Sequence, residues 1–215
     1  MTASLKNDLK QALLVKDYER VAELALHDKR TFSKLVALAY NKDDLLCWRA
    51  IEAMGAATRA VAPVNKVAVR NVVQRILWSA REESGGMGWS APELLAEISI
   101  AAPRYFPDIP PIIVSLHSED EEKVFLKGVL RAIGRMGESG ITDVTGGNDV
   151  IRNSLGHDDP TVRGLAIWAA SRAEIDVQDT ISAMTGDDGE LSLYDGGELV
   201  LTTVGILARK ALAAA

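Results

Sequence analysis

Groups of apolar residues recur along this chain at the spacing i, i+4, i+7 and i+8, which places them on one face of an α-helix. The clearest group is Val162, Ala166 and the alanines at 169–170. Asp159 can accept a hydrogen bond from a free backbone N–H at the start of this helix, and Pro160 suits the first helical position. The pattern therefore predicts a helix here whose small buried side chains let a neighbouring helix approach closely.

The same spacing begins at five other positions along the chain, which are Tyr18, Leu46, Leu94, Phe125 and Leu199. Most of these groups follow a second apolar, helix-like segment, of which the valine-rich stretch 67–77 is the longest. A motif Ser90-x-x-Glu93 matches a capping box at the start of one helix. No stretch alternates clearly with period two, so we expect no sheet. The chain is predicted to be all-α, with about five to six helix pairs.

Residues 155–173, LGHDDPTVRGLAIWAASRA, match the pattern Leu-x-x-x-Asp-x-x-Val-Arg-x-x-Ala. In this segment the chain resembles HEAT-like helical repeats, including the group found in phycobilisome lyases. The resemblance implies a right-handed α-α superhelix of the HEAT or armadillo-like kind, forming a single domain over residues 1–215. It also implies that the second helix of each pair lines the concave side. The resemblance brings no catalytic residue with it, and fold alone does not define function.

Composition excludes several classes of protein. Hydrophobic residues make up 47% of the 215 residues, which is too many for a disordered chain. Cys47 is the single cysteine, so an intramolecular disulfide or an all-cysteine metal site cannot form. The sequence starts without a secretory signal and has no apolar run of membrane-spanning length, which favours a cytoplasmic location. The net charge of −6 disfavours general nucleic-acid binding. We expect no cofactor and no metal.

A glycine-rich loop at 82–97 interrupts the repeat, and function in repeat proteins tends to lie at such insertions. Carboxylates and an indole ring close together suit a cation, an amine or a protein partner. The alternative is a tight interhelical turn, with the tryptophan packed as a plug and the glutamates in solvent. The candidate binding residues are Glu82, Glu83, Ser84, Gly85, Gly86, Met87, Trp89, Glu93 and Glu97.

A second interruption at 186–197 is rich in aspartate and glycine. It lacks the register of a calcium loop, so we interpret it as an exposed acidic turn before a final helix that starts at Leu199. Leu193 and Tyr194 are expected to anchor this turn to the preceding repeat. Cys47 is expected to be a packing residue rather than a nucleophile, and Trp78 is expected in the core.

The leading functional hypothesis is a protein-binding scaffold or adaptor that uses a solenoid groove and the 82–97 loop. Candidate groove residues on second helices are Arg49, Glu52, Arg131, Arg135 and Arg172. One alternative is a lyase-like or accessory protein that handles a tetrapyrrole or another small ligand on a client protein, although no reactive constellation supports enzyme activity. A second alternative is nucleic-acid binding through the basic flank Lys66, Arg70, Arg75 and Arg81. The alanine-rich C-terminal helix also predicts a homodimer.

Overall fold

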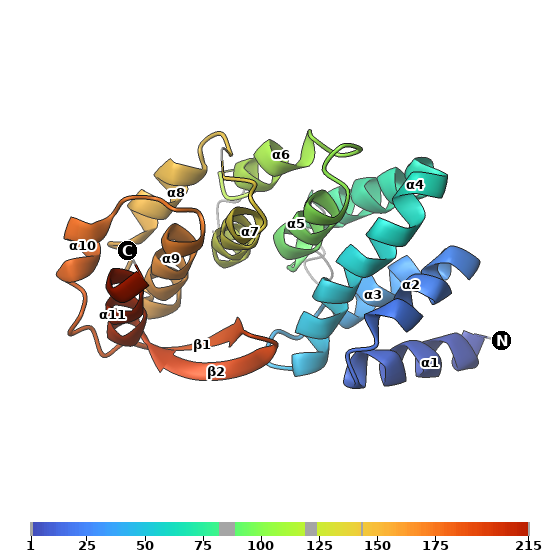
Figure 1. Cartoon of the computed structure of the whole chain (residues 1–215), viewed down its shortest axis with the longest axis horizontal. Coiled ribbons are helices and arrows are strands. Elements are labelled where there is room, and N and C mark those ends of the chain that lie inside the picture. Colours follow the sequence, from blue (N-terminus) through green and yellow to red (C-terminus); the bar gives the residue numbers. More distant parts are fainter. Residues whose placement is uncertain (1, 82–88, 119–123, 143, 215) are drawn as a thin grey trace. The chain divides into compact units, whose positions relative to one another are not determined.

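The computed structural model describes residues 2–81, 89–118, 124–142 and 144–214, and side chains are described from Leu5 onward. Within these residues the protein is mostly helical, with eleven helices and one two-stranded sheet (Figure 1). The chain divides into two compact units, an N-terminal unit of residues 1–107 and a C-terminal unit of residues 108–215. The prediction of a single repeat domain stays a prediction.

The N-terminal unit contains α1 (Thr2–Leu14), α2 (Tyr18–His27), α3 (Arg30–Leu38), α4 (Leu45–Arg81) and α5 (Ala91–Ala101). The long helix α4 packs against α2, α3 and α5 and lies beside all three in Figure 1. The apolar faces of these helices meet in a core that includes Leu9, Leu35, Met54 and Leu94.

Helix α4 consists of two helical segments that meet at Asn65. The backbone of Asn65 is not helical, with φ −152° and ψ 71°, and Pro63 lies just before it. Oδ1 of Asn65 accepts a hydrogen bond from the backbone N–H of Ala68 at 3.0 Å, so this side chain caps the second segment. The predicted helices around Leu46 and over 67–77 are both confirmed, including the valine-rich stretch.

The predicted capping box at the start of α5 is wrong. Ser90 is the N-cap residue, but its hydroxyl makes no hydrogen bond to the backbone of the first turn. Glu93 does not reach back to Ser90, because its carboxylate binds Lys42 at 2.5 Å. The side chain of Glu93 therefore forms a tertiary ion pair with Lys42 instead of the local hydrogen bond to Ser90 that a capping box requires.

The C-terminal unit contains α6 (Ile109–Ser115), α7 (Leu126–Glu138), α8 (Gly147–Ser154), α9 (Pro160–Arg172), α10 (Gln178–Ser182), β1 (Glu190–Asp195), β2 (Glu198–Thr203) and α11 (Val204–Ala214). Helices α7, α9 and α11 pack in succession, and α6, α8 and α10 each pack against the helix that follows (Figure 1). The predicted start of α9 is confirmed, because the Asp159 side chain accepts a hydrogen bond from the backbone N–H of Thr161 at 2.7 Å.

Helices α7 and α9 approach closely at two glycines. A Cβ atom placed on Gly134 would lie 2.1 Å from the Trp168 ring, and one on Gly137 would lie 2.6 Å from the Cα of Ala173. Real Cβ atoms are not found at such distances, so both positions require glycine for this helix contact.

The expectation that the chain has no sheet is wrong. Strands β1 and β2 form an antiparallel hairpin in which Asp195 pairs with Glu198. Gly196 and Gly197 form its turn, with φ values of +59° and +87° that favour glycine. The final helix accordingly begins at Val204 rather than at Leu199. The predicted anchoring role agrees with the burial of Leu193 and Tyr194, which are each 3% exposed.

Candidate functional site

The glycine-rich loop contributes three described residues to the candidate site, and these are Trp89, Glu93 and Glu97. The other candidate residues of the loop, Glu82, Glu83, Ser84, Gly85, Gly86 and Met87, lie outside the described residues. Trp89 directly precedes α5, and Glu93 and Glu97 lie one turn apart on that helix.

Trp89 forms an exposed aromatic stack with Tyr40, which follows α3. The two ring centroids are 6.1 Å apart and the ring planes differ by 18°. Trp89 is 47% exposed and Tyr40 is 51% exposed. The tryptophan is therefore not a buried plug, and both rings of the pair are in contact with solvent.

Lys42 connects the backbone beside this aromatic pair to its surroundings through three contacts. Its ammonium group donates to the backbone oxygen of Trp89 at 3.1 Å and to Oε1 of Glu93 at 2.5 Å. Its own backbone oxygen accepts a hydrogen bond from the indole Nε1 of Trp48 at 2.9 Å. The turn between α3 and α4 is thus joined to the start of α5.

The carboxylate of Glu93 points into the protein rather than into solvent. Glu93 is 3% exposed, and its second oxygen, Oε2, is buried with no hydrogen-bond partner among the described residues. Cys47, which is 1% exposed, lies in the same region. Burial, together with the negative charge of Glu93, raises the pKa of the Cys47 thiol to about 12. This thiol is neutral at ordinary pH and is a poor nucleophile.

Glu97 is also buried, with 6% of its surface exposed. It packs against Gly55 of α4, where an added Cβ atom would lie 3.1 Å from Oε2 of the glutamate. Glu93 and Glu97 therefore do not form an open acidic surface around Trp89. Among the described residues of the loop, the side chain that faces solvent is the aromatic one, Trp89.

The two candidate groove residues on α4 bind groups of their own unit. The guanidinium of Arg49 donates to the backbone oxygen of Leu14 at 2.7 Å, at the end of α1. Oε2 of Glu52 accepts a hydrogen bond from the Tyr18 hydroxyl at 2.5 Å. Both side chains thus connect α4 to the helices that precede it.

In the C-terminal unit, two candidate groove residues meet at one aromatic ring. The guanidinium carbons of Arg131 on α7 and Arg172 on α9 each lie 4.2 Å from the ring centroid of Trp168. Arg131 also lies 5.6 Å from the Tyr194 ring and is 5% exposed. A desolvated cation over an indole face is favourable by about 2 kcal/mol, so these contacts stabilise the junction of α7, α9 and β1.

Asp195 connects the hairpin to α9. Its Oδ1 accepts a hydrogen bond from Arg172 at 2.8 Å and one from the Trp168 indole at 3.4 Å. A cavity of about 350 Å³ lies beside these groups, between α9, the hairpin and α11, with Lys210 also on its wall.

Arg135, the remaining groove candidate, pairs with Glu138 on its own helix at 2.5 Å.

The described residues hold no group of three or more His, Cys, Asp or Glu side chains that could bind a metal ion. The same residues include no helix that is both long enough and apolar enough to cross a membrane.

Sequence reasoning missed two residues of the aromatic site, Tyr40 and Lys42. Tyr40 carried a weak signal, since it is an aromatic residue beside the turn-forming residues 41–44. Lys42 carried none, because its partner Glu93 is 51 residues away. Trp168 was missed as a partner of Arg131, and Asp195 as a partner of Arg172, for the same reason. The contact between Trp168 and Arg172 is different, because the two residues are one turn apart on α9 and their spacing was a signal in the sequence.

Comparison with known proteins identifies one relative. No protein-family profile matches the chain. The chain is 30% identical over 171 residues to a protein of Archaeoglobus fulgidus described as an uncharacterized protein, and the match covers 79% of this chain and 89% of the relative. The chain therefore belongs to the same family as this archaeal protein.

Two crystal structures of engineered proteins also resemble the chain. The first has a TM-score of 0.49 and 17% identity, and the match covers 98% of this chain and 96% of the engineered one. The second has a TM-score of 0.46 and 16% identity, with 96% and 98% covered.

Proposed function

We propose that the protein is a helical binding module that captures a protein partner through the stacked pair of Tyr40 and Trp89, referred to below as the aromatic anchor. The observation that carries this proposal is the exposure of both rings, about half of each, in a fixed stack. Tyrosine and tryptophan are enriched among the few residues that dominate binding energy at protein interfaces.

The contacts of Lys42 support the proposal because they position the backbone that carries Trp89. The ammonium group binds both the backbone oxygen of Trp89 and the side chain of Glu93. A backbone that is already ordered loses little conformational entropy on binding. The ring of Trp89 is oriented by its stack on Tyr40.

The burial of Glu93 and Glu97 bears on which kind of partner side chain can bind at the aromatic anchor. Since Glu93 is paired with Lys42 and Glu97 packs on Gly55, their charges are directed inward. The anchor then suits a flat or apolar side chain of a partner protein, which can stack on or pack against the rings. Capture of a small cation by these two carboxylates is less well supported.

The proposal includes a HEAT-like α-α superhelix as the framework. The order of packing in the C-terminal unit supports it, because α7, α9 and α11 follow one another and α6, α8 and α10 precede them in turn. In a helical repeat of this kind, successive pairs bury a continuous core and leave a surface free for a partner. The homodimer through α11 stays a prediction.

Two observations bear on the alternative functions. The buried, neutral thiol of Cys47 disfavours lyase-like chemistry at that residue. One member of the basic flank, Arg70, has its guanidinium 4.9 Å from the Phe106 ring centroid and lies against the backbone oxygen of Tyr105. That contact within the protein disfavours a role for Arg70 as a nucleic-acid contact.

Affinity capture from the native cell with single-residue variants tests the proposal. The wild-type protein is expected to enrich a protein partner that Tyr40→Ala and Trp89→Ala both lose. Tyr105→Ala is the matched control, because Tyr105 is a 40% exposed aromatic residue of the same unit outside the anchor. Thermal unfolding curves would show that all variants remain folded.

Calorimetry with the purified partner would then give the affinities. We expect each anchor variant to weaken binding at least 30-fold, in line with about 2 kcal/mol for an interface hot spot. Equal binding by the wild type, both anchor variants and the control would overturn the proposal, as would the absence of any enriched protein.

A further inference from the structure

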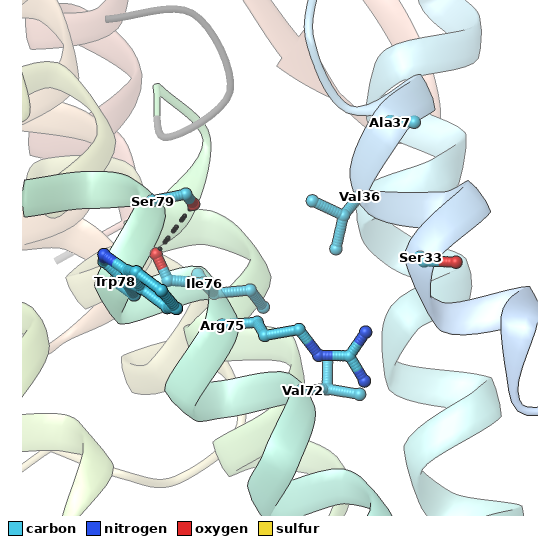
Figure 2. A pocket seen from close by; sticks show the side chains of 8 residues that line it. All are labelled: Ser33, Val36, Ala37, Val72, Arg75, Ile76, Trp78 and Ser79. Atoms are coloured by element: carbon cyan, nitrogen blue, oxygen red, sulfur yellow. Dashed lines mark hydrogen bonds between the residues drawn. The ribbon is translucent and has the colours of Figure 1, made fainter. Parts of the chain in front are cut away.

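We propose that the N-terminal unit has a second binding site, a pocket between α3 and the C-terminal segment of α4 that accepts a small apolar carboxylate. The pocket has a volume of about 330 Å³. Val36 and Ala37 on α3 and Val72, Arg75 and Trp78 on α4 line it, and Figure 2 shows Val36 and Arg75 extending into the space between the two helices. This site is separate from the aromatic anchor and does not depend on the proposed protein partner.

The walls of the pocket are almost entirely apolar. Val72 and Ile76 form its inner side and are 5% and 2% exposed, whereas Trp78 is 68% exposed at the rim. The expectation that Trp78 lies in the core is therefore wrong. An open apolar pocket of this size is at the lower end of the range for small-ligand sites, about 300 to 1,000 Å³.

The hydroxyl groups that line the pocket are already used within their own helices. Ser33 donates to the backbone oxygen of Arg30 at 2.8 Å. Ser79 donates to the backbone oxygen of Ile76 at 3.0 Å, which is the dashed line in Figure 2. Neither hydroxyl has a hydrogen left to donate, so these two residues do not favour an anion.

Arg75 is the one charged residue among the described residues that line the pocket, and it determines which ligand fits. Its guanidinium extends into the space between the helices in Figure 2. Among the described residues, its hydrogen bond is a long one of 3.4 Å from Nε to the backbone oxygen of Asn71. The terminal nitrogens remain available, and a carboxylate can accept two parallel hydrogen bonds from a guanidinium.

The site thus combines an apolar pocket with the cationic guanidinium of Arg75. Arg75 is exposed, so water solvates its guanidinium when the pocket is empty. A neutral apolar molecule would fill the pocket without forming an ion pair, and a cation would be repelled. An anion with a short apolar body satisfies both parts of the site. A medium-chain fatty acid or an aryl carboxylate has this chemistry.

Isothermal titration calorimetry of the full chain with sodium octanoate and sodium decanoate tests the proposal, and 1-decanol serves as the neutral counterpart. We expect one molecule of carboxylate to bind per chain. Each buried methylene should raise the affinity about fourfold until the pocket is full. Decanoate should bind up to about fivefold more tightly than decanol, because only the carboxylate pairs with the exposed guanidinium of Arg75.

Three variants locate the site. Arg75→Met should weaken decanoate binding up to about fivefold while leaving decanol binding unchanged. Arg59→Met is the matched control, since Arg59 is an exposed residue of α4 that does not line the pocket. Ala37→Trp should fill the pocket and abolish binding of both ligands. Because Ala37 is exposed, this variant is expected to fold normally, which a thermal unfolding curve would verify.

Several outcomes would overturn the proposal. Equal affinity for decanoate and decanol would remove the role of Arg75, and unchanged binding by Ala37→Trp would place the ligand elsewhere. The proposed carboxylate site would also be rejected if the wild-type protein fails to bind decanoate at millimolar concentration. Light scattering that shows a dimer broken by Ala37→Trp would instead assign the pocket to a second copy of the chain. Tyr40→Ala should leave decanoate binding unchanged, which separates this test from that of the aromatic anchor.

Discussion

The ammonium group of Lys42 lies 2.5 Å from Oε1 of Glu93, and this ion pair joins the turn after α3 to the first turn of α5. The glutamate is 3% exposed at its side chain and the lysine is 32% exposed. A charge buried to this degree depends strongly on its partner, since the low-polarity surroundings supply little other solvation.

Replacing Lys42 with methionine should therefore destabilise the protein substantially. We expect the free energy of unfolding to fall by about 3 kcal/mol, because the change leaves the Glu93 carboxylate buried without its counter-charge. Urea unfolding at neutral pH measures this loss. The double variant Lys42→Met/Glu93→Met should recover part of the stability.

Arg20→Met provides the control for this experiment. Arg20 pairs with Glu23 at 2.9 Å on the surface of α2, where both side chains are about half exposed or more. Loss of such an exposed pair should cost less than about 1 kcal/mol. Similar small losses in Lys42→Met and Arg20→Met would contradict the structural role assigned to the buried pair.

The contact between α7 and α9 predicts strong intolerance to a methyl group at Gly134. In Gly134→Ala the new Cβ atom would meet the Trp168 ring and would also lie 3.1 Å from the Cα of Ala169. We expect a loss of about 2 to 3 kcal/mol in unfolding free energy, because overpacking forces the two helices apart. Chemical denaturation provides the measurement.

Gly156→Ala is the matched comparison for the Gly134 variant. No heavy atom lies within 4 Å of a Cβ atom built at Gly156, and its φ is not in the left-handed region. The change should be neutral or slightly stabilising, since alanine restricts the unfolded chain more than glycine does. A large loss at Gly156 or none at Gly134 would be inconsistent with the described helix contact.

The burial of Cys47 predicts that its thiol resists alkylation in the folded protein. Its pKa is raised from 9.0 to about 12, which lowers the thiolate fraction at pH 8 by about a thousandfold. Labelling with iodoacetamide, followed by mass spectrometry, should be slow in the native state and rapid in urea. Fast native labelling at pH 8 would show that Cys47 is accessible and ionised.

The same shift has a consequence for stability at high pH. As pH rises from about 9 to about 12, the thiol loses its proton in the unfolded chain but keeps it in the folded one. The unfolded state then binds fewer protons, so the unfolding free energy falls with pH across this window. The stability of the wild type relative to Cys47→Ala should fall correspondingly, and a constant difference would contradict the shift.

Asp28 is predicted to titrate well below an ordinary aspartate. Hydrogen bonds from the side chain and the backbone N–H of Arg30 lower the pKa of its carboxyl from 3.8 to about 2. The ionised form favours the folded state above pH 3.8, and this contribution is lost as pH falls toward 2. Carboxyl carbon NMR across pH 1.5 to 5 would follow the titration.

Arg30→Gln should raise the pKa of Asp28 toward its ordinary value, because the side-chain hydrogen bonds and the positive charge are removed. The remaining backbone hydrogen bond, at 2.9 Å, should keep part of the shift. A pKa near 3.8 in the wild-type protein would show that the contact with Arg30 is not formed in solution.

Most of the helical framework could be predicted from local sequence. The spacing of Val162 and Ala166, with Asp159 and Pro160 before them, predicted α9 and its start because helix periodicity and capping involve residues within a few positions of one another. The valine-rich stretch 67–77 was also predicted as a helix. There the flanking periodicity outweighed the preference of valine for strands.

The hairpin escaped prediction because its two strands are short and only partly buried. Val200 and Leu201 of β2 are 45% and 72% exposed, so no alternation marks a buried face on that strand. The strand β1 does alternate, with Leu191 and Leu193 buried, but only over four residues. The pair Gly196 and Gly197 between two apolar stretches was the available signal, since a two-residue turn with positive φ at both positions favours glycine.

By itself, the sequence determined which segments become helices, because each helix face and cap depends on neighbours along the chain. Only the tertiary structure decided what the candidate residues do. Glu93 was predicted to face a ligand, but it binds Lys42, and Arg131 and Arg172 meet at Trp168 rather than standing free. The partners in the first case are 51 residues apart. The pairs Lys42–Glu93 and Arg131–Trp168 follow from how the helices pack, and that packing is not encoded in any local spacing, whereas Arg172 meets Trp168 one turn away on the same helix.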